Sequence, residues 1–317
     1  MALMLLKRFF AVACFALFFS VPSIAAQIKL GVSIPSFEDR WLTILRNAMQ
    51  NHAQNSDIEL VFMNAENQVD MQFSHVEGFI ADGVDGLIVI PVNTDATVQI
   101  SDDASKAVTP LVFLNRMPIN VDSLPSLQRV VLPDEQESGE LQVGQVCKVL
   151  GGQGAIGIIT GDISSASALM RTKDIHDVIS IRPCNQLILR AEQESDWTRE
   201  GGYQVMKGWL ESGIELDGVV ANNDEMALGA IQALKEAKVP MESIVVAGID
   251  ATPDALASMQ KNELDISVYQ DANAQAATAI QVVIDLLLTK IDPGGPIVTW
   301  IPFKLVVPSN LGEFTSQ

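Results

Sequence analysis

Apolar and polar positions follow one repeating order along this chain. A short apolar run is followed by a few polar residues, and a segment with helical periodicity then begins. The order is clearest where residues 218–221 are followed by Asn-Asn-Asp and then by a helix-spaced segment from Met226. Further runs of this kind lie at residues 28–32, 60–63, 86–90, 111–114, 155–160, 186–189, 243–248 and 266–269. The pattern predicts strands that alternate with helices.

Alternating strands and helices predict an α/β fold in which helices cover both faces of parallel sheets. Residues 85–89 (DGLIV) are similar to residues 217–221 (DGVVA), and polar residues and a predicted helix follow each. We therefore expect two similarly built halves. No low-complexity linker separates them, so we expect several short crossings of the chain to join the halves.

The first residues have the composition of a secretory signal peptide. Lys7 and Arg8 precede an apolar run at residues 9–21, and small residues follow it, so cleavage is expected after Ala25 or Ala26. A retained membrane anchor is the alternative, but a bilayer span needs about 20 apolar residues and this run is shorter. We expect an exported protein located in the periplasm.

The remaining chain is strongly acidic. Removing Lys7 and Arg8 from the 20 basic residues leaves 18 against 39 acidic ones, a formal charge of −21. Such a surface repels phosphate backbones and anionic lipid, which disfavours nucleic acid as a partner. Two cysteines remain, Cys147 and Cys184, and their spacing fits either a disulfide or two buried thiols.

The common signatures of enzyme active sites give little support. Residues 152–157 spell G-x-G-x-x-G, but they precede and enter a predicted strand, so they cannot place a helix N-terminus on a pyrophosphate. His52, His75 and His176 lie in predicted helices without metal-ligand spacing. There is no G-x-S-x-G motif, and no feature marks a pair of acids as general acid and base. We predict no enzyme activity, no cofactor and no metal.

The ends of the predicted strands carry groups that suit a neutral polyol. Sugars and cyclitols offer apolar C–H faces to aromatic rings and a ring of hydroxyls to carboxylates, amides and guanidinium groups. Simpler alternatives exist. Asn223 or Asp224 would cap the helix without binding a ligand, and Trp41 and Trp197 would pack in the core. The candidates at the strand ends are Phe37, Glu38, Asp39, Arg40, Trp41, Asn115, Arg116, Ser164, Ser165, Arg171, Trp197, Asn223, Asp250 and Gln270.

Five segments resemble the motifs of periplasmic sugar-binding proteins of the ribose and galactose/glucose type. They span nearly the whole mature chain in the family's order: residues 31–41, 113–118 (FLNRMP), 221–227 (ANNDEMA), 248–251 (GIDA) and 270–273 (QDAN). The resemblance implies the periplasmic binding protein type I fold, with two doubly wound parallel-sheet domains joined by three hinge crossings. It also implies a ligand in the interdomain cleft, delivery to the membrane subunits of an ABC importer, and a monomer.

The resemblance also implies where the domains divide. Matched segment by segment, the crossings fall near residues 131–134, 270–272 and 304–307. We therefore expect a signal peptide at 1–26, an N-terminal lobe at 27–132 plus 272–304, and a C-terminal lobe at 133–271 plus 305–317.

By the same resemblance, each strand-end candidate receives a role. Trp41 and Trp197 match the aromatic residues that cover opposite faces of the sugar. The residues that match polar partners of its hydroxyl groups are Asp39, Asn115, Arg116, Arg171, Asn223, Asp250 and Gln270. Phe37 and Arg40 lie beside Asp39 and complete the predicted site.

The chain departs from the family's pattern at two points. Ser165 and Ser167 stand where the galactose/glucose proteins have a His and an Asp, and there is no D-x-N-x-D-G calcium loop. Galactose and calcium are therefore not expected. The pair Asn115-Arg116, with Arg171 after a serine-rich turn, is more similar to the inositol-binding members, so a cyclitol such as myo-inositol is the leading ligand.

Three alternatives share the fold. An exported sensory receptor for a hexose or pentose would present its closed form to a chemoreceptor or sensor kinase. A regulator similar to the lactose repressor would need a helix-turn-helix before the first strand, where this chain has only a signal peptide. A secreted enzyme on the same fold is the third.

Overall fold

The computed structural model describes residues 27–54, 56–289 and 294–315. The predicted signal peptide and its cleavage point before Gln27 therefore precede the described residues.

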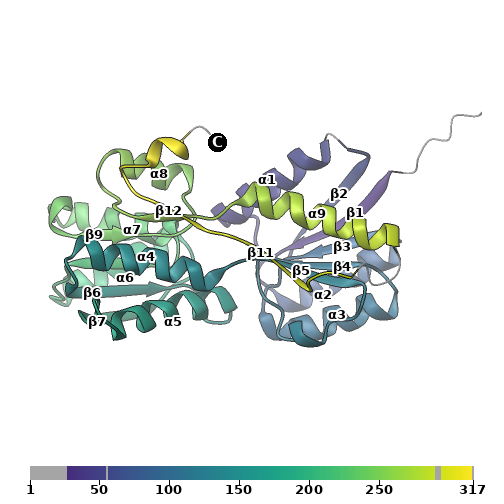
Figure 1. The fold of residues 1–317 in the computed structure, drawn as a ribbon, viewed down its shortest axis with the longest axis horizontal. Coiled ribbons are helices and arrows are strands. Elements are labelled where there is room, and N and C mark those ends of the chain that lie inside the picture. The colour runs from purple at the N-terminus through teal and green to yellow at the C-terminus, as the bar shows by residue number, and fades with distance from the viewer. Residues whose placement is uncertain (1–26, 55, 290–293, 316–317) are drawn as a thin grey trace, which may run out of the picture.

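Two parallel sheets form the centres of the two lobes (Figure 1). The first sheet has the order β11-β5-β4-β3-β1-β2, and every pair of neighbours in it is parallel. Its strands are β1 (Ile28–Ile34), β2 (Ile58–Asn64), β3 (Gly86–Val89), β4 (Leu111–Leu114), β5 (Gln128–Pro133) and β11 (Val298–Ile301). The second sheet, β7-β6-β8-β9, is also parallel. Its strands are β6 (Gln153–Thr160), β7 (Gln186–Glu194), β8 (Gly218–Ala221) and β9 (Val245–Ala247).

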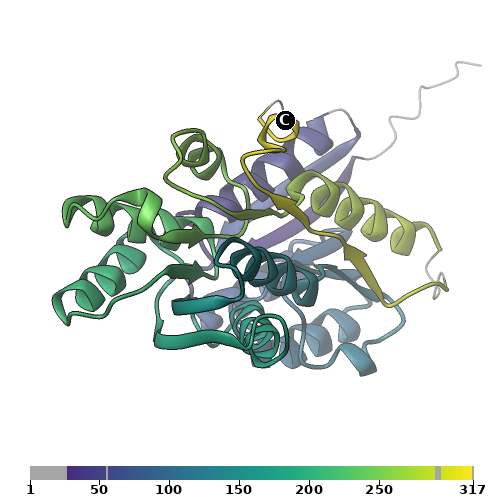
Figure 2. The same cartoon turned by 60° about the vertical axis from the view of Figure 1, so that its left-hand side comes forward.

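Helices cover the sheets, as the turned view makes clear (Figure 2). The first lobe has α1 (Arg40–Gln54), α2 (Val69–Ala81), α3 (Thr97–Lys106) and α9 (Ala272–Thr289). The second has α4 (Glu135–Val149), α5 (Ala166–Ser180), α6 (Arg199–Glu211), α7 (Asp224–Glu236) and α8 (Pro253–Gln260). Short 3-10 turns lie at Thr94–Ala96, Val121–Ser123, Met241–Ser243 and Leu311–Glu313. The predicted alternation of strand and helix is confirmed.

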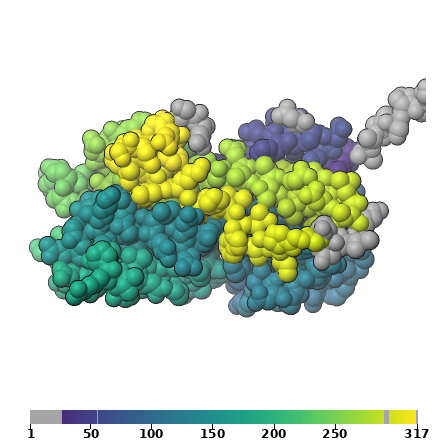
Figure 3. Space-filling model, in the orientation of Figure 1, coloured from purple at the N-terminus to yellow at the C-terminus, as the bar shows by residue number. Residues whose placement is uncertain are grey.

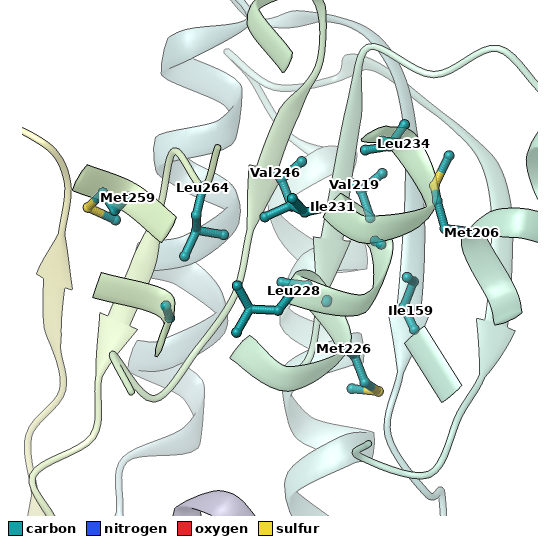
Figure 4. Close-up of a cluster of buried hydrophobic side chains, with 14 of the residues drawn as sticks. Ile159, Met206, Val219, Met226, Leu228, Ile231, Leu234, Val246, Met259 and Leu264 are labelled. Atoms are coloured by element: carbon teal, nitrogen blue, oxygen red, sulfur yellow. The ribbon is translucent and has the colours of Figure 1, made fainter. Parts of the chain in front are cut away.

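The central strands β3, β4 and β8 are buried on both faces of their sheets, which explains why they are unbroken apolar runs. In the first lobe, α1 and α9 pack on one face, and a separate cluster that includes Phe79, Phe113 and Ile100 fills the other. In the second, the largest cluster joins the sheet to α6, α7 and α8 (Figure 4). α9 is long and apolar enough to cross a membrane by length and composition, but it packs on α1 and the first sheet as a core helix does.

Three short strands were not predicted as strands. β5 begins with the polar residues Gln128 and Arg129, and its end was interpreted only as a crossing. β11 is an edge strand in which Trp300 is 49% exposed. β12 (Lys304–Val306) pairs antiparallel with β10 (Ser267–Tyr269), a small addition to the predicted parallel pattern.

The chain passes between the two lobes three times within the described residues. It crosses between β5 and α4, between β10 and α9, and between β11 and β12. The last crossing lies over the junction of the lobes in the space-filling view (Figure 3). On this basis we propose the lobe boundaries that the resemblance implies, 27–132 plus 272–304 and 133–271 plus 305–317, with Lys304 at the boundary because it pairs with Tyr269.

A disulfide joins Cys147 to Cys184, whose Cα atoms lie 5.6 Å apart. The sequence left open a disulfide or two separate buried thiols, and the structure contains the disulfide. It ties the end of α4 to the segment that leads into β7.

Candidate functional site

Most of the predicted strand-end residues meet in one cavity between the lobes, and Phe37, Glu38, Arg40 and Ser164 do not line it. Its volume is about 40 Å³, and it shares Asp39, Arg116 and Trp197 with an outer groove of about 430 Å³. The wall consists of Asp39, Trp41, Leu42, Asn115, Arg116, Ser165, Ser167, Arg171, Trp197, Asn223, Asp250 and Gln270. A wider groove of about 650 Å³ lies over α7 and α8, but its lining is helical surface and contains none of the predicted site residues.

Asp39 and Trp41 come from the start of α1. The Oδ1 atom of Asp39 accepts a hydrogen bond of 2.8 Å from the backbone N–H of Leu42, so this carboxylate begins the helix as well as lining the cavity. Burial raises the pKa of Asp39, and the positive charge of Arg116 opposes the rise. Trp41 is buried and packs in the core of the first lobe while it also reaches the cavity. The packing and binding interpretations of Trp41 are thus compatible.

Asn115 and Arg116 follow β4. Asn115 has φ = 68°, a left-handed conformation that Asn tolerates better than most residues, and its Nδ2 donates to Oε1 of Gln275 at 3.3 Å. Nη1 of Arg116 donates to the carbonyl oxygens of Pro91 at 3.0 Å and Val92 at 3.2 Å. These bonds fix the guanidinium group, so it meets a ligand without first becoming ordered.

Arg171 lies in the first half of α5 and carries the densest set of contacts at the site. Its Nε donates to Oε2 of Glu135 at 2.6 Å, and its Nη2 donates to Oε1 of the same carboxylate at 3.1 Å. Nη1 donates to the carbonyl oxygen of Asn222 at 2.7 Å, and Nη2 reaches Oε1 of Gln270 at 3.4 Å. Burial alone would lower the pKa of Arg171, but the ion pair with Glu135 raises it above its usual value.

Trp197 is held in a strained position by a glycine and an asparagine. Its backbone has φ = 67°, which is unfavourable for an aromatic residue, and a Cβ atom at Gly161 would lie 2.2 Å from the indole ring. Nδ2 of Asn223 donates to the carbonyl oxygen of Trp197 at 3.0 Å. Oδ1 of Asn223 accepts from the backbone N–H of Met226 at 3.0 Å, so the helix-cap interpretation of Asn223 is confirmed while the residue also lines the cavity.

Asp250 presents an unsatisfied carboxylate to the cavity. Its Oδ1 lies 4.0 Å from Nη1 of Arg171, too far for a hydrogen bond, and within the described chain its side chain has no hydrogen-bond donor at closer range. Burial raises the pKa of Asp250 well above its ordinary value, and Arg171 opposes this effect. Asp250 also has φ = 121°. A buried carboxylate with free oxygen atoms is ready to accept hydrogen bonds from a ligand.

Two further polar atoms of the wall lack partners among the described residues. Nε2 of Gln270 and Oγ of Ser165 are buried without a hydrogen bond. Buried donors are normally satisfied, so these atoms also point to a polar ligand.

The structure does not bring Phe37 and Arg40 to this cavity. The ring of Phe37 packs against the guanidinium group of Arg46, 4.2 Å from its centroid, and Arg40 is exposed at the outer groove. Phe37 precedes α1, which starts at Arg40. Within the helix successive side chains point about 100° apart, so Trp41 and Leu42 reach the cavity while Arg40 does not.

Glu135 and Asp224 show what the sequence interpretation missed. Glu135 holds Arg171 from the start of α4, but residues 131–134 before it were interpreted only as a crossing. Asp224, next to Asn223, is fully buried behind the wall, where it accepts from Ser267 Oγ at 2.7 Å and from the N–H of Thr252 at 2.8 Å. In the part of the chain that the structure describes, no group of three or more His, Cys, Asp or Glu side chains is arranged to hold a metal ion.

Comparisons with known proteins agree with this geometry. A family model described as a periplasmic binding protein domain matches residues 30–291. A putative rhizopine-binding protein from Rhizobium meliloti is 45% identical over 300 residues, which cover 94% of this chain and 96% of that protein. A xylitol-binding protein from Mycolicibacterium smegmatis is 31% identical over 256 residues, 80% of this chain and 70% of that protein.

Among solved structures, an ABC transporter solute-binding protein from Bacillus halodurans with bound myo-inositol superposes with a TM-score of 0.84. It is 36% identical in sequence, and the match covers 93% of this chain and 99% of that one.

Proposed function

The chain belongs to the periplasmic binding protein domain family, and from this premise we propose that it captures a neutral cyclic polyol or sugar between its lobes and delivers it to an ABC importer. The leading candidate is myo-inositol or a related cyclitol. Members of this family are solute-binding proteins, and we infer that this chain likewise binds its ligand without turning it over.

One observation carries the proposal: both lobes contribute an indole and polar groups to a single cavity. Trp41 and Asp39 come from one lobe, and Trp197 and Asp250 from the other. A cyclitol has two apolar faces for the indoles and hydroxyl groups that both donate and accept around its edge. The free atoms of Asp250 and Gln270 supply matching acceptors and donors.

The similarity to the myo-inositol-bound protein supports a cyclitol over other polyols. The identity of 36% extends over nearly the whole chain. The resemblance of the Asn115-Arg116 pair and Arg171 to the inositol-binding members implies the same ligand class.

Delivery follows from closure of the lobes about the three crossings. A ligand held by one lobe offers its remaining hydroxyl groups to the other, so binding stabilises the closed form. The importer then recognises the closed form. We propose that the protein works as a monomer, that its signal peptide is cleaved after Ala25 or Ala26, and that a chemoreceptor or sensor kinase could read the same closed form.

A thermal-shift panel on the mature protein tests the function. Inositols, pentoses, hexoses and related amines are added one at a time, and a ligand present at 100 times its Kd should stabilise the folded state by about 2.7 kcal/mol. We expect the largest rise in Tm with a cyclitol, reversible binding by calorimetry, and unchanged ligand by product analysis. The proposal fails if no neutral polyol raises Tm, or if the ligand is converted.

A further inference from the structure

Most of the hydrogen-bonding capacity of Arg171 is used inside the protein. A guanidinium group has five N–H donors. The Nε donor and one Nη2 donor go to Glu135, the other Nη2 donor goes to Gln270, and one Nη1 donor goes to the Asn222 carbonyl. Among the described residues this leaves one donor, on Nη1, the nitrogen that lies 4.0 Å from Asp250.

One of the two edges with which Arg171 could hold an anion is occupied by Glu135. Arg binds carboxylates and phosphates most strongly with two parallel N–H···O bonds, and the Nε–Nη2 edge of Arg171 makes that pair of bonds to Oε2 and Oε1 of Glu135. Glu135 does not line the cavity. It therefore makes no direct contact with a ligand in the cavity, and its hydrogen bonds act through the arginine.

The charges at the cavity also disfavour an anion. Arg116 and Arg171 are the positively charged groups of the cavity wall, and the acidic side chains that act on them are Asp39, Glu135, Asp162, Asp224 and Asp250. Asp39 attracts Arg116 and Glu135 is paired with Arg171, so both guanidinium groups already have an acidic partner, and the carboxyl group of Asp250 lies 4.0 Å from Arg171. An anionic group beside the free Nη1 donor would approach this carboxylate.

We propose that Glu135 determines ligand specificity by keeping Arg171 neutralised and its bidentate edge filled, so that the cleft accepts neutral polyols and rejects their carboxylate and phosphate derivatives. The inference rests on the proposed function and deepens it, since it defines the charge class of the ligand. Glu135 is a positioning residue that lies behind the binding surface.

Substitution Glu135→Gln tests the proposal, with Glu140→Gln as the matched control. Glu140 is an exposed glutamate on the same helix, so its substitution changes the net charge equally without touching Arg171. Calorimetry at fixed ionic strength compares D-glucose with D-glucuronate and myo-inositol with myo-inositol 1-phosphate. For wild type and Glu140→Gln we expect weak or no binding of the anions. For Glu135→Gln we expect the ratio of anion to neutral affinity to rise by about tenfold or more.

The variant Glu135→Asp separates a role in ligand specificity from a role in stability alone. It retains the negative charge, so it should continue to reject the anions even if its melting temperature falls. An unchanged anion-to-neutral ratio in Glu135→Gln overturns the proposal.

If Glu135→Gln does not fold, the wild-type protein still tests the proposal. The proposal is overturned if wild type binds an anion and its neutral counterpart with affinities within about threefold of each other. Failure of wild type to bind any neutral polyol is a different result. It removes the proposed function, while gain of D-glucuronate binding in Glu135→Gln over Glu140→Gln still decides the role of Glu135.

Discussion

Side chains at this site stabilise local structure and also line the cavity. Asp39 caps α1 and faces the cavity, and Asn223 caps α7 while it holds the backbone of Trp197. Such a residue cannot relax when a ligand arrives, because its backbone partners fix its rotamer. The site is therefore largely ordered before binding, which lowers the entropic cost of gripping a small molecule.

Substitution Asp250→Ala should weaken ligand binding by roughly 2–4 kcal/mol, and Trp197→Ala by a similar amount, as for buried anchors in other interfaces. Asp250 is 5% exposed, so its loss leaves ligand hydroxyls buried without an acceptor. Calorimetry with the ligand found by thermal shift measures the change. Asp254→Ala is the control, because Asp254 is paired with Arg199 outside the cavity. Near-native affinity in both site variants would remove the two residues from the site.

Asp174 offers a second prediction, on stability against pH. It is 3% exposed against α4, and its Oδ2 lacks a partner among the described residues. Burial raises its pKa from 3.8 to about 7, against the opposing charge of Lys173. The folded state thus holds this proton more tightly than the unfolded chain, and stability is lost as pH rises from about 4 to about 7.

The variant Asp174→Asn should therefore be more stable than wild type at pH 8, by about 1–2 kcal/mol, with the gain fading at pH 4. Urea denaturation at the two pH values measures the difference. Asp177→Asn, on the exposed side of α5, should show no such gain, since it breaks a surface ion pair with Lys173. Equal stability of Asp174→Asn and wild type at pH 8 would contradict the assignment.

At the residue scale, the sequence predicted the site residues whose positions follow from the local order of strand and helix. Asp250 and Asn223 stand where a strand ends, and that position alone brings them to the cleft. The link from Glu135 to Arg171 joins residues 36 apart in sequence, and no local pattern marks it. Phe37 packs against Arg46 instead of lining the cavity, and no local pattern marks that contact either.

At the scale of elements, the helices α6 and α7 can pack closely because each has a glycine at their contact. A Cβ atom at Gly229 would lie 2.0 Å from the carbonyl oxygen of Arg199, and one at Gly202 would lie 2.2 Å from that of Met226. The opposing atoms are backbone, so they cannot move aside as a flexible side chain would. The two helices thus touch backbone to backbone beside the site residue Trp197.

Gly229→Ala should destabilise the protein by about 2–3 kcal/mol through overpacking. Gly208→Ala is the matched control on α6, where a Cβ would meet nothing within 4 Å, and it should stabilise by about 0.5–1 kcal/mol through helix propensity. Thermal unfolding of both variants separates the two effects. A stable Gly229→Ala protein would mean that the helices can separate without cost.

The strands also differ in how well the sequence predicts them. β4 and β8 are buried on both faces, so their apolar runs ended where the strands end. β5, β11 and β12 depend on pairing with distant segments, and their own residues include polar or exposed side chains such as Arg129, Trp300 and Lys304. Pairing across the chain, and not local preference, makes these segments strands.

For the whole molecule, the disulfide is the clearest test of stability. Its cysteines are separated by 37 residues, and closing a loop of that length restricts the unfolded chain by about 4 kcal/mol in the chain-entropy model. The double variant Cys147→Ala, Cys184→Ala should lose about that much on denaturation, while ligand affinity stays near native because the bridge is outside the cavity. Unchanged stability in the variant, or titration of two free thiols in the mature protein, would contradict the bridge.

The return of the chain to the first lobe has a consequence during synthesis. α9 and β11 complete the first lobe, yet the ribosome makes them only after residues 135–271 of the second lobe. Until α9 emerges, that face of the first sheet is covered only in part, by α1, so its core stays incomplete. The order of the elements itself postpones folding, which helps to keep the nascent chain in the extended form that a secretion channel can thread.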